Sequence, residues 1–209
     1  MNEPVFVAGT GIISAIGNNT AACLDALEHG RAGMGEMQVL HSVHRQRLPV
    51  AEVKLSNEEL AAIAGLPSIK SRTALLSKVA ATEALANAGI ENLSSLRKGF
   101  ISANSVGGMD KTENFFSDFI TGEHKGRLRN VVNHECGSVT ELVADALDLK
   151  DYVTTISTAC SSSANAIFFA ARLIRNNILD VAVAGGTDSL TRFTLNGFNT
   201  LMIVDEKFC

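Results

Sequence analysis

The sequence has little of what marks a membrane, secreted or repetitive protein. No apolar run approaches the roughly 18 residues that a membrane-spanning helix needs. The Met-Asn-Glu-Pro start has neither the basic residues nor the apolar stretch of a signal peptide. No internal repeat, low-complexity tract or linker divides the chain. We therefore expect a cytoplasmic protein that does not contact a membrane.

Cysteine is also scarce, and its spacing argues against two kinds of site. No two of the 4 cysteines form a C-x-x-C pair, which favours reduced thiols over a disulfide framework; they are Cys23, Cys136, Cys160 and Cys209. The histidines supply no metal motif. His41 and His44 stand at helical spacing and His134 lies near Cys136, but neither place has a second ligand pair. We expect no bound metal.

The charge content is low as well. Charged residues make up 19% of the chain and hydrophobic residues 46%, which argues against disorder and for a substantial core. The formal net charge of -4 argues against a general affinity for nucleic acid. We expect one large domain over residues 1–209.

What is present is an alternation of strand-like and helix-like segments. The patterns predict strands over residues 5–8, 99–103, 152–158 and 180–184. They predict helices over residues 20–29, 71–88, 139–149 and 164–176, over part of 109–121, and from a Ser56/Glu59 capping box to Gly65. In the first of these helices Leu24 and Leu27 should share one face, and the apolar helix over 164–176 should be buried. Residues 31–55 show little periodicity and should cross the surface. This alternation predicts an α/β fold with a largely parallel sheet.

The segment from Ser157 to Ser163 is the most informative for chemistry. It places Cys160 where a strand ends and a helix begins, so the thiol should face free backbone N–H groups. Such a position favours the thiolate and offers donors to an oxyanion formed in acyl transfer. From spacing alone, an unreactive buried cysteine remains open as the alternative.

The glycine pairs invite a different interpretation. Gly9-x-Gly11-x-x-Ser14 begins like a dinucleotide-binding motif but lacks its third glycine, so a tight turn explains it better. Gly107-Gly108 and Gly185-Gly186 should be turns that let backbones approach each other near Cys160. We expect no cofactor.

Several motifs together resemble the β-ketoacyl synthase family, above all the run Thr158-Ala159-Cys160-Ser161-Ser162, which is similar to its active-site motif. Five further segments follow in the family's order: Val7-Ala8-Gly9-Thr10-Gly11, Ala80-Ala81 through Ala88-Gly89, Ser105-Val106-Gly107-Gly108, Ala184-Gly185-Gly186-Thr187-Asp188, and Asn196-Gly197-Phe198-Asn199 with Leu201-Met202. Asp188 stands where the family usually has Glu. The closest likeness is to the elongating synthases, which extend an acyl chain on acyl carrier protein.

This resemblance implies a fold and a reaction. The fold would be one half of the thiolase-like five-layer αβαβα architecture, with a largely parallel mixed sheet. Cys160 would be the nucleophile that takes an acyl group from a carrier thioester, and malonyl carrier protein would then lose carbon dioxide and attack the acyl-cysteine. The family's two catalytic histidines and its lysine come from a second half, which this chain, ending at Cys209, does not contain.

The resemblance also suggests binding residues and partners. Val106 and Phe198, and less clearly Phe193, would line an acyl pocket. Acyl carrier protein and a second copy of the chain, paired through 152–158, would be the partners. Five basic residues either receive the acidic carrier or form a solvated surface: Lys70, Arg72, Lys125, Arg127 and Arg129. The alternatives are a non-catalytic subunit similar to a chain-length factor, a thiolase or a starter-type synthase.

Overall fold

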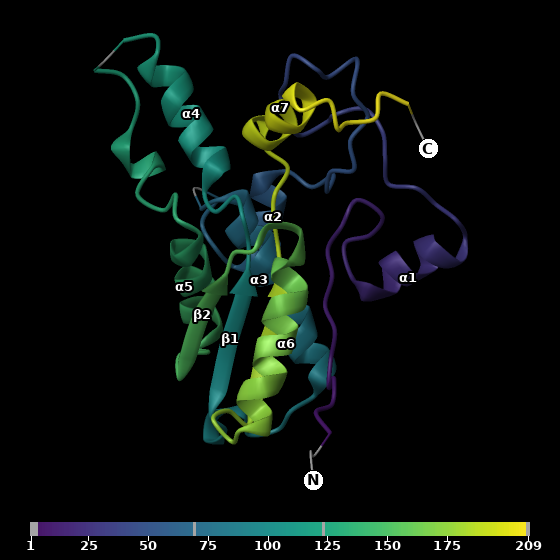
Figure 1. The fold of residues 1–209 in the computed structure, drawn as a ribbon, viewed down its shortest axis with the longest axis vertical. Coiled ribbons are helices and arrows are strands. Elements are labelled where there is room, and N and C mark those ends of the chain that lie inside the picture. The colour runs from purple at the N-terminus through teal and green to yellow at the C-terminus, as the bar shows by residue number, and fades with distance from the viewer. Residues whose placement is uncertain (1–3, 69, 123, 208–209) are drawn as a thin grey trace.

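A parallel sheet forms the centre of the molecule (Figure 1). The computed structural model describes residues 4–68, 70–122 and 124–207. The sheet has the order β2-β1-β3, formed by β1 (Lys98–Ala103), β2 (Tyr152–Ile156) and β3 (Val181–Gly186). Ile101 lies opposite Thr154 of β2 and Ala184 of β3, and both pairings are parallel. The predicted α/β class is therefore confirmed.

Helices surround this sheet. The α-helices are α1 (Thr20–Glu28), α2 (Asn57–Ala64), α3 (Arg72–Ala88), α4 (Met109–Phe119), α5 (Cys136–Leu147), α6 (Ser162–Arg175) and α7 (Arg192–Thr200). Three short 3-10 turns are η1 (Leu93–Ser95), η2 (Leu128–Asn130) and η3 (Ala159–Ser161). Within the described ranges, no helix is both long and apolar enough to cross a membrane.

Each face of the sheet has its own hydrophobic core. On one face, Phe100 of β1 packs with Ala74 of α3 and Val143 of α5. On the other face, Ile101 packs with Ala166 and residues further along α6. Alternate residues of β1 therefore serve opposite cores, as the pleat of a strand covered on both faces requires.

The predicted helix ends are confirmed by their caps. Ser56 Oγ accepts the Glu59 N–H at 3.2 Å, while Glu59 Oε2 accepts the Ser56 N–H at 2.7 Å, which completes the capping box. Gly65 and Gly89 end α2 and α3 in the left-handed conformation, with φ of 64° and 57°. A residue without a side chain adopts this conformation at the lowest cost.

The N-terminal prediction is wrong. Residues 5–8 form no strand, and Phe6 and Val7 are 82% and 80% exposed rather than buried. The chain nevertheless lies closely against α3, because a Cβ at Gly11 would come within 2.0 Å of Ala80 O. The segment is thus placed by glycine contacts with a helix, while its apolar side chains face outward.

Residues 31–55 depart from the prediction in a different way. They contain no helix or strand, as expected, but they do not simply cross the surface. Met37, Leu48 and Val50 are buried against Leu195 of α7. Neither this cluster nor the helix α7 was predicted, because the contacts join segments about 150 residues apart and leave no local pattern.

Two helices expose apolar residues, and only for the helix over 164–176 did the sequence predict burial. In α6, Ile167 and Phe168 are 55% and 60% exposed, so the prediction of a buried helix holds for one face only. In α1, Cys23 and Ala26 face inward while the predicted pair Leu24 and Leu27 faces solvent. The helical period identifies an apolar face, but not whether another element covers it.

Candidate active site

Cys160 lies in a sharp turn between β2 and α6. The turn η3 continues directly into the first residue of α6, Ser162, so the thiol is at the helix N-terminus as predicted. Cys160 is exposed. The preceding residue, Ala159, has a φ of 53°, a left-handed conformation that is unusual for a residue with a side chain. Such strain is often found where a side chain must project from a turn toward a reactant.

Ser162 stabilises this turn from inside. Its Oγ accepts the Thr158 N–H at 2.7 Å and donates to Ala159 O at 2.7 Å. Ser162 is only 5% exposed, so both hydrogen bonds are shielded from water. The buried side of the turn is therefore fully bonded, and the strained residue 159 is held between the two contacts.

Glycines allow close backbone approaches around the same edge of the sheet. A Cβ at Gly186 would lie 2.0 Å from Ser163 Oγ, so a glycine at the end of β3 lets the start of α6 come close. A Cβ at Gly107 would lie 2.2 Å from His134 O, and Gly107 has a φ of 51°. The predicted turn at Gly107-Gly108 is confirmed, although Gly107 meets the segment before α5 rather than Cys160. The predicted turn at Gly185-Gly186 is wrong, because both residues lie in β3, and only Gly186 comes close to the start of α6.

Asp188 connects the two glycine-containing loops. Its Oδ1 accepts the backbone N–H groups of Ser105 at 2.8 Å and Val106 at 3.0 Å.

Burial, with the nearby charge of Asp188, raises the pKa of the Cys136 thiol. Cys136 is therefore disfavoured as a thiolate, in contrast to what is expected of an exposed cysteine at a helix N-terminus.

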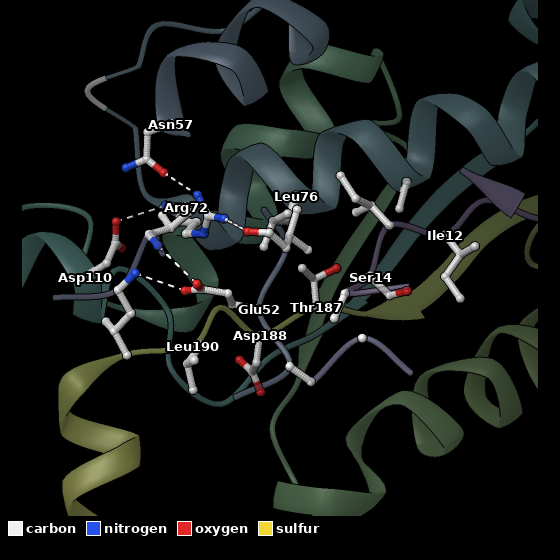
Figure 2. A pocket seen from close by; sticks show the side chains of 18 of the residues that line it. Ile12, Ser14, Glu52, Asn57, Arg72, Leu76, Asp110, Thr187, Asp188 and Leu190 are labelled. Atoms are coloured by element: carbon white, nitrogen blue, oxygen red, sulfur yellow. Dashed lines mark hydrogen bonds between the residues drawn. The ribbon is translucent and has the colours of Figure 1, made fainter. Parts of the chain in front are cut away.

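None of the predicted acyl-pocket residues lines either of the two best-formed cavities in the described part of the chain. Val106 is half-buried in the loop held by Asp188, whereas Phe193 and Phe198 of α7 are 63% and 48% exposed. A cavity of about 840 Å³ is lined by none of these three and not by Cys160. It lies between residues 11–16, the 39–53 segment and the starts of α3, α4 and α7 (Figure 2).

Buried charges line this cleft, and the sequence reasoning missed them. Glu52 is 4% exposed and accepts the N–H groups of Val39 at 3.1 Å and Leu40 at 3.0 Å, as well as that of Gln38. Burial alone would raise the pKa of Glu52, but these bonds outweigh it and lower the pKa. The partners lie 12–14 residues away in a segment without periodicity, so no local motif signals them.

Arg72 occupies the same cleft. It is 8% exposed and donates to Val53 O, Leu55 O and Asn57 Oδ1 at 2.7–2.9 Å. Its backbone N–H donates to Asp110 Oδ2 at 3.0 Å, while burial raises the pKa of Asp110 (Figure 2). Arg72 is thus unavailable to an acidic partner, and its inclusion in the basic surface is wrong.

The other basic residues lie elsewhere. Lys125 and Arg127 are exposed on the segment that joins α4 to η2, Arg129 is exposed within η2, and Lys70 is half-buried. Figure 1 shows α4 and this segment extending away from the sheet. Three of the five predicted basic residues therefore share one exposed arm.

The fold and the turn around Cys160 define the class of protein. Residues 2–207 match the model of the β-ketoacyl synthase, N-terminal domain, and the chain belongs to that family.

Two of its curated relatives are named as 3-oxoacyl-[acyl-carrier-protein] synthases. It is 26% identical over 209 residues to 3-oxoacyl-[acyl-carrier-protein] synthase 2 of Coxiella burnetii, covering 97% of this chain and 50% of that protein. It is 29% identical over 210 residues to 3-oxoacyl-[acyl-carrier-protein] synthase 1 of Escherichia coli K12, covering 97% and 51%. The chain thus spans about half the length of these relatives.

Solved structures show the same thiolase-type fold. The ishigamide ketosynthase/chain length factor superposes with a TM-score of 0.83 at 20% identity, covering 93% of this chain and 50% of that chain. A type II polyketide synthase acyl carrier protein in complex with its ketosynthase bound to the hexaketide gives 0.77 at 18% identity, covering 97% and 50%. The predicted fold is confirmed.

Proposed function

We propose that this chain supplies the nucleophile of an elongating β-ketoacyl-acyl carrier protein synthase, and that Cys160 is that nucleophile. The observation that carries the proposal is the position of Cys160. The chain belongs to the β-ketoacyl synthase family. In its structure the Cys160 thiol is exposed in a turn, with the left-handed Ala159 before it and the N-terminus of α6 after it. Free N–H groups at such a site favour a thiolate and can stabilise an oxyanion.

The proposed reaction has two steps. The Cys160 thiolate attacks the carbonyl carbon of an acyl thioester; a new C–S bond forms, and the carrier thiolate leaves and takes up a proton. The malonyl thioester then loses carbon dioxide, and its carbanion attacks the acyl-cysteine, which releases Cys160 as thiolate. Covalent catalysis divides one difficult step into two easier ones. By family resemblance, the histidines and lysine that assist the second step lie outside residues 1–209.

Binding roles follow from the same proposal. Residues 1–209 would form the half that holds the nucleophile. Val106, positioned by Asp188, and the exposed Phe198 and Phe193 would line the acyl pocket once other chain segments cover them. Lys125, Arg127 and Arg129 on the exposed arm would receive the acidic carrier protein. Related structures, a ketosynthase/chain length factor and an acyl carrier protein in complex with its ketosynthase, support partners of this kind.

A non-catalytic partner subunit is the second candidate, because one related structure contains a chain length factor. In such subunits the active cysteine is replaced. The presence of Cys160 in an exposed, strained turn favours an enzyme over this non-catalytic subunit. The same turn is also compatible with another acyltransferase of the thiolase fold, which is the alternative among enzymes.

The test is acyl-enzyme formation. The purified protein is incubated with an acyl-acyl carrier protein, and peptide mass spectrometry follows the added acyl mass. We expect it on the peptide containing Cys160 and expect none in the Cys160→Ala variant. A Cys136→Ala variant serves as the matched control and should still be acylated. Acylation that persists without Cys160 contradicts the assignment, and no acylation of the wild type favours the non-catalytic subunit.

A further inference from the structure

The turn around Cys160 is held on its exposed side by a second set of hydrogen bonds. Asn165 Nδ2 donates to Thr158 Oγ1 at 2.8 Å and to Ser161 Oγ at 3.3 Å. Ser161 Oγ in turn lies 2.9 Å from Thr158 O, to which it donates. Thr158 precedes Cys160 and Ser161 follows it, so one amide bridges the residues on both sides of the thiol. We call Thr158, Ser161 and Asn165 the exposed clasp.

The exposed clasp is not needed to pack α6 on the sheet. The helix is buried through Ala166, Ala170 and Leu173, whereas Asn165 is exposed. Asparagine is also a poor helix former, because its side chain competes for hydrogen bonds with the backbone. Asn165 neither packs in the core nor favours the helix, yet it bonds to both sides of one turn. Its presence at this position is best explained by a role in holding that turn.

The turn needs such support because Ala159 is strained. A left-handed residue other than glycine costs about 1–3 kcal/mol and persists only where its surroundings hold it. Ser162 supplies two bonds from the buried side. Without the exposed clasp, Thr158 and Ser161 would be free to rotate on the other side, and Ala159 could relax. The backbone N–H and the thiol of Cys160 would then move together.

We propose that Asn165 is a positioning residue, which holds Cys160 at the N-terminus of α6 in the orientation needed for acyl transfer. This inference rests on the proposed function in naming acyl transfer as the step served. Asn165 acts through the hydroxyls of Thr158 and Ser161 and does not itself react. The effect should be on the reactivity of Cys160 rather than on the stability of the fold.

The experiment compares variants of the purified full-length protein. Asn165→Ala removes the bridging amide, Thr158→Val removes its main acceptor at nearly constant shape, and Asn165→Gln keeps the amide on a longer arm. Asn176→Ala is the matched control, because Asn176 also donates from its side chain, to Arg172 O at 2.7 Å, but at the other end of α6. The probes are iodoacetamide over a range of pH and the hexanoyl thioester of N-acetylcysteamine.

The expected results are specific to Cys160. Asn165→Ala should slow hexanoyl transfer about fivefold, the effect of losing one ordinary hydrogen bond, and should slow the alkylation of Cys160. Asn165→Gln should recover part of both losses. The double variant with Thr158→Val should lose less than the two single variants lose together, because both remove the Asn165–Thr158 contact. Each single variant also removes one contact of its own, Asn165 to Ser161 in the first and Ser161 to Thr158 Oγ1 in the second. Thermal unfolding of Asn165→Ala and Asn176→Ala should be alike.

Two results would overturn the inference. One is an alkylation rate and a transfer rate in Asn165→Ala that equal those of the wild type. The other is additive losses in the double variant, which would mean that Asn165 and Thr158 act separately. The alkylation measurement does not depend on catalysis. If the wild type takes no hexanoyl group, the proposed function fails, while the rate at which Cys160 is alkylated still decides whether Asn165 positions the thiol.

Discussion

At the scale of single residues, the described cysteines differ in ways that should be measurable. Cys160 is exposed at a helix N-terminus, whereas Cys23 is 3% exposed, with its Sγ 3.3 Å from Ser14 Oγ. Cys136 lies between them in exposure, and burial raises the pKa of its thiol. Reactivity of a thiol follows access and thiolate content, so these three should react at different rates.

The first prediction concerns alkylation. Under limiting iodoacetamide at neutral pH, Cys160 should be modified first, and Cys136 and Cys23 should be modified more slowly by at least about tenfold. Peptide mass spectrometry at several times gives the three rates in one sample. A Cys160→Ala variant shows whether the remaining thiols keep their own rates. If Cys23 reacts as fast as Cys160, the buried and exposed assignments are wrong.

A second prediction concerns pH. Hydrogen bonds from the Arg97 side chain and backbone lower the pKa of Asp180 to about 2. An unfolded aspartate has a pKa of about 3.9, so the folded state is favoured above that pH. This stabilisation should be lost as the pH falls from about 4 to about 2. Both side chains are exposed, so the contribution is small and weakened by salt.

Urea unfolding between pH 2 and pH 6 measures this contribution. Asp180→Asn should remove part of the pH dependence of the unfolding midpoint in that window. Asp118→Asn, on the exposed side of α4, is the control and should change it less. Equal pH profiles for the wild type and Asp180→Asn would contradict the prediction.

At the scale of elements, the ends of the parallel strands bring the motifs together. β1 leads to Asn104 and the Gly107-Gly108 loop, β2 leads to the turn of Cys160, and β3 leads to Gly186 and Asp188. Parallel strands place their carboxyl ends at one edge, and this is where α/β proteins carry their sites. Asp188 joins two of these loops through Ser105 and Val106, so the loops form one connected unit.

The third prediction concerns the Gly107-Gly108 loop, which follows β1 at this edge of the sheet. Gly107→Ala should destabilise the fold by about 1–3 kcal/mol, because the new Cβ would meet His134 O and the residue would keep a positive φ. Gly137→Ala, in α5 with no atom near its added Cβ, is the matched control. It should stabilise the helix slightly, since alanine is the better helix former. Chemical denaturation checks both, and equal effects would contradict the prediction.

At the scale of the whole molecule, several large apolar side chains are exposed in the described part of the chain. Phe6, Val7, Ile167 and Phe168 are exposed, and β2 has no strand on its outer edge among the described residues. Exposed patches and free strand edges mark surfaces that another segment or chain covers. Two predictions follow from the two kinds of surface.

The fourth prediction concerns residues 1–209 alone. Without the decarboxylation groups of the second half, several kcal/mol of transition-state stabilisation should be missing, where each 1.36 kcal/mol is about tenfold in rate. We expect no measurable malonyl-dependent condensation and low solubility. Condensation assays with purified residues 1–209 and with the complete 3-oxoacyl-[acyl-carrier-protein] synthase 1 of Escherichia coli K12 make the comparison. Steady turnover by residues 1–209 would place the acid-base groups within them.

The fifth prediction is a homodimer built around β2. Tyr152 to Ile156 is rich in β-branched residues, and Val153 is 36% exposed at the sheet edge. Val153→Glu should weaken the dimer, because it would bury an unpaired charge in the interface. Val43→Glu, in a 93% exposed loop position, is the control. Analytical ultracentrifugation measures both, and a monomeric wild type would exclude the dimer.

Local interactions determined much of the structure from sequence alone. The helix caps at Ser56, Gly65 and Gly89, the strand over 99–103 and the position of Cys160 before α6 depend on neighbours within a few residues, so their patterns are visible in the sequence. Motif resemblance then identified the family before any contact was known.

Only the tertiary structure decided which apolar and charged residues are covered. The burial of Glu52 and Arg72, the exposure of Phe168 and the contact of residues 37–50 with α7 all depend on segments far apart in the chain. A local pattern carries no record of such partners, because burial is a property of what packs against a face and not of the face itself. The exposed clasp of Asn165 is intermediate: its residues are close in sequence, but only the turn brings their side chains together.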